Sequence, residues 1–136
     1  MPDSRLKNIK VVAVDDNADS RKLLQAILER SSAEAAVVSS AREALAAIKN
    51  IRPDVLICDL AMPKMDGYEL LENVRNLEPE LGRLPMIAFT AAASNEDRAR
   101  TLRAGFKAHI VKPVDPNKLV TTILELATAD ARERLL

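Results

Sequence analysis

Four apolar segments of this 136-residue sequence are each followed by a side chain that can do chemistry. Asp15 and Asp16 follow the first segment, Asp59 follows "DVLIC", Thr90 follows "PMIAF" and Lys112 follows "AHIV". Three carboxylates and one ammonium group in a small space leave about −2 of formal charge, which proteins relieve by raising pKa values or by binding a cation. Because Mg²⁺ prefers oxygen ligands, we expect Asp15, Asp16 and Asp59 to hold Mg²⁺ or Mn²⁺.

A carboxylate beside a divalent ion can also attack phosphorus and form an aspartyl phosphate. Asp59 is the candidate for that role, because the apolar run before it would fix it at the end of a buried strand. A lysine charge, a hydroxyl and a backbone N–H group can hold phosphoryl oxygens, and Lys112, Thr90 and the small residue Ala91 supply them. Taken singly, the acidic residues could cap helices or turns and Lys112 could be a solvated charge. The prediction therefore depends on their joint occurrence.

The elements that position these side chains follow from the apolar pattern. Short, continuous apolar runs rich in β-branched residues are typical of strands that are covered on both faces. We predict strands at residues 10–14, 35–39, 54–58, 85–89 and 108–111.

Helical patterns separate these strands, and each begins at a recognisable cap. The caps are a capping box at Ser40 and Glu43, Asp66 with Glu69, Ser94 with Asp97, and Asp115 followed by Pro116. Five strand–helix units with short connections predict one α/β domain with an open parallel sheet and helices on both faces. Ligands bind outside the carboxyl ends of such strands, so the polar side chains should meet at one edge.

Composition excludes several classes of function. The 20 basic and 20 acidic residues cancel, with a pI near 6.6, so we expect no direct binding to nucleic acid. No apolar stretch approaches a membrane span, and the N-terminus lacks a signal-peptide core, so we expect a cytoplasmic protein. The single cysteine, Cys58, lies in an apolar run and is expected in the core. We divide the chain into a lead at 1–9, the domain at 10–127 and an extension of the last helix at 128–136.

Four segments together resemble the signature blocks of a known family. They are "VVAVDDNAD", "DVLICDLAMPKMDGYEL", "PMIAFTA" and "AHIVKP", and they resemble the receiver domain of two-component response regulators from about Lys10 to Ala127. The resemblance implies a flavodoxin-like (βα)5 fold, a doubly wound sheet of strand order 2-1-3-4-5. It also implies that Asp59 is the phosphoacceptor, and that Asp15 and Asp16 hold Mg²⁺ with Asp59 and the backbone carbonyl of Ala61.

The same resemblance assigns the remaining site residues. Thr90, Ala91 and Lys112 would bind the phosphoryl group and couple it to a switch, and the peptide bond before Pro113 would be cis. The chain departs from the family at His109, three residues before Lys112, where receivers usually carry Tyr or Phe.

Two interpretations of His109 stay open. It could pack on the sheet with ordinary hydrogen bonds, or it could be a rotating switch residue. An unperturbed histidine has a pKa of about 6.5, so the second interpretation would make signalling sensitive to pH. A His109→Tyr variant with the same pH response as the parent would exclude it.

As a receiver, the chain would be a phosphorylation-dependent switch and not an enzyme by role, although it could lose its phosphoryl group by autodephosphorylation. A sensor histidine kinase or a phosphotransfer protein would be the donor, and an unknown downstream protein would take the signal. The surface that changes would include the helix after Ser94, strand 108–111 and the helix after Asp115, which could also form a homodimer. The chain could be a stand-alone protein or a piece of a hybrid kinase.

Two alternatives come from other classes of protein. A pseudo-receiver would bind partners independently of phosphorylation, and metal binding would distinguish it. A small-molecule phosphatase that forms an aspartyl phosphate typically has a second aspartate two residues after the nucleophile. Ala61 occupies that position, which disfavours the phosphatase.

Overall fold

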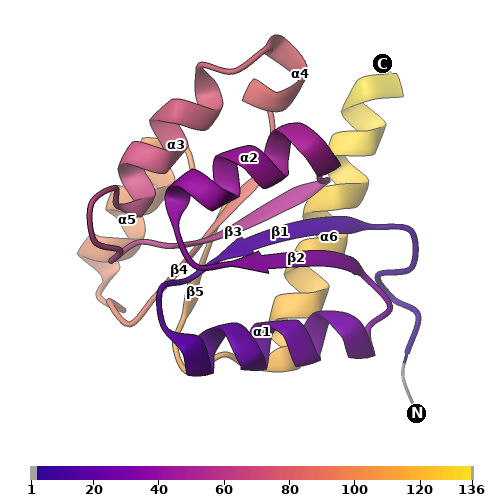
Figure 1. The fold of residues 1–136 in the computed structure, drawn as a ribbon, viewed down its shortest axis with the longest axis horizontal. Coiled ribbons are helices and arrows are strands. Elements are labelled where there is room, and N and C mark those ends of the chain that lie inside the picture. The colour runs from indigo at the N-terminus through magenta and orange to yellow at the C-terminus, as the bar shows by residue number, and fades with distance from the viewer. Residues whose placement is uncertain (1–2, 136) are drawn as a thin grey trace.

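The computed structural model describes residues 3–135, with side chains described for residues 3–129. Five parallel strands form one sheet in the order β2-β1-β3-β4-β5, as predicted (Figure 1). The strands are β1 (Lys10–Val14), β2 (Glu34–Val38), β3 (Val55–Asp59), β4 (Met86–Thr90) and β5 (Ala108–Val111). Within the described backbone, no helix is long and apolar enough to cross a membrane.

Helices cover both faces of the sheet. They are α1 (Ala18–Arg30), α2 (Ala41–Ile51), α3 (Gly67–Arg75), α4 (Pro79–Gly82), α5 (Asn95–Ala104) and α6 (Pro116–Leu135). Apolar side chains of α1 and α6 pack on one face of the sheet, and those of α2 and α3 pack on the other. Alternate residues of β1 serve the two cores, with Val12 on one side and Val11 on the other. Burial on both faces explains why the strands are continuous apolar runs.

Three predicted strand boundaries were one residue off. β2 begins at Glu34, whose N–H bonds to the Ile9 carbonyl, and not at residue 35. β3 runs through Asp59, because Asp54 leaves the strand and accepts a hydrogen bond from the Lys10 N–H at 2.9 Å. β4 likewise begins one residue later than predicted and includes Thr90. Asp59 and Thr90 are thus the last residues of their strands rather than the first residues after them.

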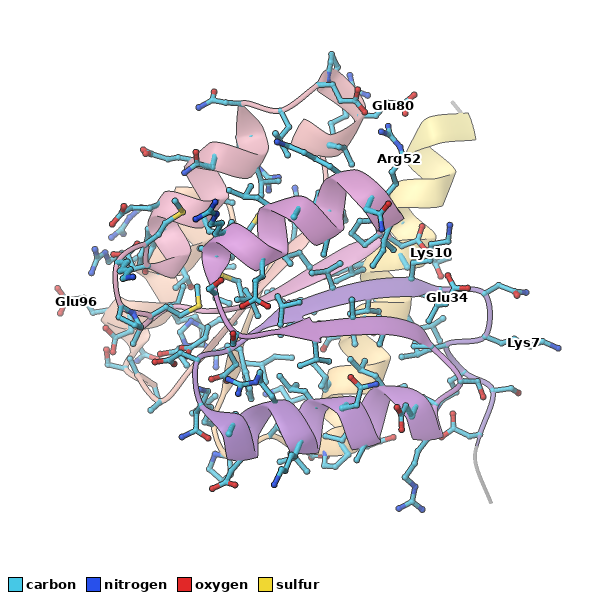
Figure 2. The ribbon with its side chains drawn as sticks, in the orientation of Figure 1. Lys7, Lys10, Glu34, Arg52, Glu80 and Glu96 are labelled. Atoms are coloured by element: carbon cyan, nitrogen blue, oxygen red, sulfur yellow. The ribbon has the colours of Figure 1, made fainter. Side chains whose placement is uncertain are left out.

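The short helix α4 was not predicted. Its four residues are too few for any apolar period, and tertiary contacts stabilise it instead. Arg52 reaches it across the surface and forms ion pairs with Glu78 and with Glu80, the latter at 3.1 Å (Figure 2). Arg75 donates a hydrogen bond to the Gly82 carbonyl at 3.0 Å.

The predicted helix starts are otherwise present. Ser94 and Asp97 form a complete capping box, and Asp66 accepts the Glu69 N–H at 2.9 Å. At α2 only half of the capping box forms: Ser40 accepts the Glu43 N–H, but the Glu43 carboxylate accepts the hydroxyls of Ser39 and Ser40 instead of a backbone N–H.

Candidate functional site

The carboxyl ends of β1, β3, β4 and β5 meet at one edge of the sheet. Val14 of β1 is in register with Cys58 of β3, so Asp15 and Asp59 follow side by side. Carboxylate oxygens of Asp15, Asp16 and Asp59 all lie within 4.8 Å of one another. Asp15 and Asp59 are buried, whereas Asp16 is exposed. The structure therefore brings together the three predicted acidic residues, with one of them open to solvent.

Lys112 completes this cluster from the end of β5. Its Nζ lies 2.9 Å from Oδ2 of Asp15 and 3.6 Å from Oδ2 of Asp59, and 5.0 Å from the centroid of the Phe89 ring. The peptide bond between Lys112 and Pro113 is cis. One cation therefore faces two buried carboxylates, which leaves the cluster with an excess of negative charge.

The donor set fits a divalent cation. Asp15 Oδ2 is buried and, among the described residues, no donor meets it with hydrogen-bond geometry. Its 2.9 Å contact with Lys112 is thus an ion pair and not a directional hydrogen bond. A buried carboxylate oxygen without a donor is costly unless a cation is close to it. The three carboxylates, one of them exposed, offer oxygen ligands that suit Mg²⁺, which keeps several water molecules in its octahedral shell.

Electrostatics single out Asp59 among the acidic residues. Burial raises the pKa of Asp59 from 3.8 to about 6, and the neighbouring charge of Asp15 adds to the rise. The backbone N–H of Ala61 donates to Asp59 Oδ1 at 3.1 Å, and that bond, with the charge of Lys112, opposes the rise in pKa. Ala61 therefore contributes an N–H group to Asp59, whereas its predicted part in metal binding, through its carbonyl, stays a prediction.

The backbone below Asp59 is closely packed. Gly67 donates its N–H to the Leu60 carbonyl at 3.1 Å. A Cβ atom at Gly67 would lie 2.9 Å from the Asp59 carbonyl oxygen and 2.8 Å from Cδ2 of Leu60. The Cys58 Sγ donates to the Asp59 carbonyl at 3.4 Å, and burial raises the pKa of this thiol, so it stays protonated as the core residue that we predicted. Only glycine fits against the backbone that carries Asp59.

Thr90 is the last residue of β4, next to β3, and Ala91 follows it. Thr90 is buried, and its Oγ1 accepts the backbone N–H of Ala92 at 3.1 Å. Ala91 is exposed at the same edge. These residues lie where the sequence places them, and their predicted contacts with a phosphoryl group stay a prediction.

His109 lies apart from the carboxylates, against α5. The residue is 5% exposed, and its ring places Nε2 2.9 Å from the Ala92 carbonyl oxygen and Nδ1 2.9 Å from Oγ1 of Thr101. The structure thus has the packed, hydrogen-bonded arrangement that was the first of the two interpretations.

The sequence did not identify three residues around this site. Arg21 of α1 donates from Nη1 to the Asp15 carbonyl at 3.0 Å and so stabilises the backbone that carries Asp15. Its signal was weak: a basic residue one turn into the helix that follows the acidic pair. Phe89 lies beneath the lysine ammonium, and Thr101 bonds to His109. Neither had a sequence signal, because both contacts depend on tertiary packing.

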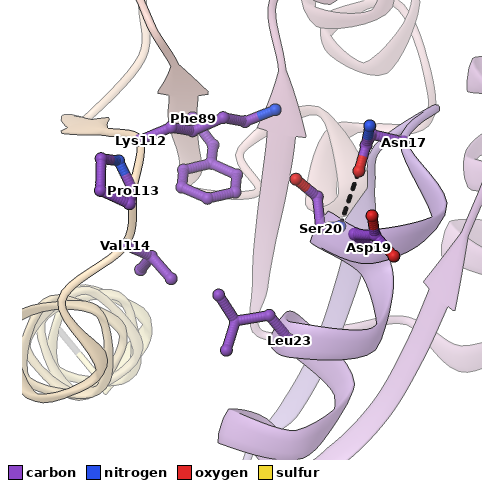
Figure 3. Close-up of a pocket in the computed structure, with 8 residues that line it drawn as sticks. All are labelled: Asn17, Asp19, Ser20, Leu23, Phe89, Lys112, Pro113 and Val114. Carbon is purple, nitrogen blue, oxygen red and sulfur yellow. Dashed lines mark hydrogen bonds between the residues drawn. The ribbon is translucent and has the colours of Figure 1, made fainter.

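A pocket of about 400 Å³ opens beside the cluster. Figure 3 shows side chains of α1 facing those of β4 and of the segment after β5 across this pocket. Its lining consists of Asn17, Asp19, Ser20, Leu23, Phe89, Lys112, Pro113 and Val114. The surface of this pocket is mostly apolar, and it lies next to the charged cluster.

Comparisons with known proteins agree with this geometry. The family model for the response regulator receiver domain matches residues 11–124. The 14.6 kDa protein of the sodA1 3′ region of Leptolyngbya boryana is 42% identical over 124 residues, which cover 91% of this chain and 94% of that protein. Transcriptional regulatory protein ZraR of Salmonella typhimurium is 34% identical over 125 residues, 92% of this chain but 27% of ZraR. The chain thus corresponds to a minor part of that regulator.

A solved structure adds information on the metal. The receiver domain of a sensor histidine kinase from Pseudomonas aeruginosa PAO1 is 26% identical and superposes with a TM-score of 0.80, over 88% of this chain and 98% of that one. Its crystal structure has a magnesium ion coordinated in the active site cleft.

Proposed function

Because the chain belongs to the response regulator receiver domain family, we propose that Asp59 accepts a phosphoryl group in a Mg²⁺-dependent reaction and that the domain then signals by changing conformation. The main support is the juxtaposition of Asp15, Asp16, Asp59 and Lys112 at one edge of the sheet. The match of the family model to residues 11–124 supports the proposed extent of the domain, 10–127, with the flanking segments 1–9 and 128–136 outside it.

Several residues have separate roles in the transfer of the phosphoryl group. Asp59 must be ionised to attack, and the Ala61 N–H and the Lys112 charge favour that form against the effect of burial. A carboxylate oxygen of Asp59 forms a bond to phosphorus while the bond from phosphorus to the donor's histidine nitrogen breaks, and its electron pair stays on that nitrogen. The metal, when bound, screens the repulsion between the carboxylates and the incoming phosphoryl group.

The phosphoryl oxygens then need donors of their own. The Lys112 ammonium, the Thr90 hydroxyl and the backbone N–H of Ala91 are the groups that we assign to them. Asp15 and Asp16, with Asp59 and the Ala61 carbonyl, would hold the Mg²⁺ or Mn²⁺ ion. These roles make the chain a phosphoacceptor switch and not an enzyme by role.

The partners follow from that role. A histidine kinase or a phosphotransfer protein would donate the phosphoryl group, in the cytoplasm. A downstream protein would recognise the surface of α5, β5 and α6, and a homodimer could form through the same surface. Pairing of the last helices through the segment "ARERLL" could also form a dimer, and the side chains of this segment lie outside the described ones.

The decisive experiment is incubation of the parent with acetyl phosphate, with and without Mg²⁺. Intact mass and the lability of the adduct to acid and base are the readout. We expect a base-labile phosphate adduct that requires Mg²⁺ and is absent from Asp59→Asn. Asp54→Asn is the matched control, because Asp54 precedes the same strand at its opposite end, and it should be phosphorylated like the parent. No adduct together with no Mg²⁺ binding would contradict the proposal and favour a pseudo-receiver.

A further inference from the structure

The ring of His109 is part of a buried chain of polar contacts between the β4–α5 loop and α5. Its Nε2 lies 2.9 Å from the Ala92 carbonyl oxygen, and its Nδ1 lies 2.9 Å from Oγ1 of Thr101. The same Oγ1 lies 2.8 Å from the Arg98 carbonyl oxygen. His109 is 5% exposed and Thr101 is fully buried, so water has little access to these contacts.

The number of hydrogens available to these three polar contacts depends on the charge of the His109 ring. The carbonyls of Ala92 and Arg98 can only accept, and the Thr101 hydroxyl has one hydrogen to give. A neutral imidazole adds one more, so the three contacts share two hydrogens. An imidazolium adds two, and every contact then has its own donor. In the neutral form, the Thr101 hydroxyl can donate to His109 Nδ1 or to the Arg98 carbonyl, but not to both at once.

Ala92 connects this chain to the phosphoryl-binding side of the domain. Its N–H donates to Thr90 Oγ1 at 3.1 Å, and its carbonyl accepts from His109 Nε2 at 2.9 Å. If the Thr90 hydroxyl moves toward a phosphoryl oxygen, its hydrogen bond with the Ala92 N–H must change. The Ala92 carbonyl is at the same time held by His109, which contacts Thr101 on α5.

We propose that His109 and Thr101 are positioning residues for the loop that follows Thr90, and that a second proton on the imidazole ring tightens their hold. The inference rests on the proposed phosphorylation of Asp59. This role differs from that of a switch residue whose side chain rotates. Both ring nitrogens of His109 have polar contacts, and the group that reorients is the Thr101 hydroxyl.

The charges around the ring are compatible with a second proton. On β4, the register neighbour of His109 is the uncharged Ala88. On α5, hydrogen bonds from Ser94 lower the pKa of the Asp97 carboxyl. Asp97 is thus an anion in the first turn of the helix whose Thr101 contacts the ring.

Two cations on the elements around the ring have contacts elsewhere. On β5, Lys112 pairs with Asp15, and Lys107, which precedes the strand, is exposed. The guanidinium of Arg100 lies 4.5 Å from the ring centroid of Tyr68 on α3. Lys112 and Arg100 thus have their contacts with groups other than the His109 ring.

The test uses the full chain, labelled with ¹⁵N, without any phosphodonor. His109 is the only histidine in the sequence, so its ring nitrogens give one assignable set of NMR signals. We expect two slowly exchanging ring N–H signals at low pH and a retained Nε2–H signal at high pH. A neutral ring protonated at Nδ1, or an Nε2–H that exchanges too fast to observe, would overturn the inference.

Thr101→Val removes the acceptor for the Nδ1–H, so the ring should lose its second proton at a lower pH than in the parent. Thr122→Val is the matched control, because the Thr122 hydroxyl donates to the Lys118 carbonyl on the surface of α6, apart from this chain. Equal titration midpoints in the two variants would count against the proposal.

A second arm measures the rate at which acetyl phosphate phosphorylates Asp59 as a function of pH. His109→Gln keeps a donor for the Ala92 carbonyl but cannot titrate, and His109→Phe keeps a ring without polar atoms. The ratio of the parent rate to the His109→Gln rate should rise about two- to tenfold as the pH falls, the range of one net hydrogen bond. His109→Phe should be slower than His109→Gln throughout.

Parallel pH profiles of the parent and His109→Gln would overturn the inference. If Asp59 takes up no phosphoryl group at all, the proposed function fails, whereas the ring spectra of the unphosphorylated protein still decide how His109 is held.

Discussion

Lys112 and Asp15 form an ion pair in which Nζ lies 2.9 Å from Oδ2, closer than the 3.6 Å that separates the same ammonium from Asp59. The Lys112 ammonium therefore lies closer to Asp15, which is fully buried. Asp59 accepts a hydrogen bond at Oδ1 from the Ala61 N–H. This asymmetry leaves Asp59 the freer of the two to form a new bond.

Replacement of Lys112 by Met should separate two properties of the site. Removal of the cation makes the cluster more negative, so Mg²⁺ should bind more tightly by calorimetry. The same change removes the ammonium that we propose as a donor for the phosphoryl group, so phosphorylation by acetyl phosphate should slow by at least about 10²-fold. Lys107→Met, at an exposed residue before the same strand, should change neither property. Weaker Mg²⁺ binding in Lys112→Met would show that the lysine orients Asp15 rather than competing for it.

Stability without Mg²⁺ should depend on pH through Asp59. Burial raises its pKa from 3.8 to about 6, so between these values the folded state binds more protons than the unfolded state. The free energy of unfolding therefore falls as the pH rises through this window. Asp59→Asn does not titrate, and above the window it should be more stable than the parent by up to ~3 kcal/mol.

Urea denaturation in Mg²⁺-free buffer below, within and above that window measures this difference. It should disappear at the acidic end, where Asp59 is protonated in both states, and saturating Mg²⁺ should reduce it at the alkaline end. A difference that is the same at every pH would mean that the substitution acts through packing.

Gly67→Ala should damage the site through the backbone. The new Cβ would lie 2.9 Å from the Asp59 carbonyl oxygen, so the segment that carries this carboxylate must shift. We expect a loss of about 1–3 kcal/mol in the free energy of unfolding and weaker Mg²⁺ binding. Gly105→Ala is the control: φ is 120° there, which strains alanine, but the nearest atom is Cδ2 of Leu71 at 3.7 Å. It should lower stability and leave Mg²⁺ affinity unchanged.

Arg75 should stabilise the fold without an acidic partner. Its Nη1 donates to the carbonyls of Gly82 and Leu84 at 3.0 and 2.8 Å, and Nη2 donates to the Gly105 carbonyl at 3.3 Å. Burial lowers the pKa of this guanidinium. Arg75→Met should cost about 2–4 kcal/mol of unfolding free energy, because it leaves three carbonyls without their donor. Arg83→Met, an exposed substitution of the same kind, should cost less than about 0.5 kcal/mol.

Much of the site could be predicted from the sequence because parallel strands direct their carboxyl ends to one edge. Given that rule, a carboxylate after "DVLIC" and a lysine after "AHIV" must be neighbours, and Lys112 indeed lies 3.6 Å from Asp59. The strand order came only from the family resemblance, since the apolar runs are alike and do not specify which strands pair.

Other features depended on contacts between distant segments. Helix α4 has no pattern of its own, and it is held in place by Arg52, which follows α2, and by Arg75 of α3. For His109 the sequence left two interpretations, because the choice depends on which residues of α5 lie over β5. The hydrogen-bonded packing of the ring depends on Thr101, eight residues earlier in the chain and on a different element, and the role of His109 as a switch stays a prediction.

The unequal access of the acidic residues to water has a kinetic consequence. Asp15 is fully buried, but Asp16 is exposed at the same cluster. An ion that enters past Asp16 can keep part of its hydration shell, so we expect it to exchange with the bulk instead of being trapped. Occupancy would then follow the free concentration of the ion by mass action. The rate at which Asp59 reacts would then depend on the free Mg²⁺ concentration around the protein.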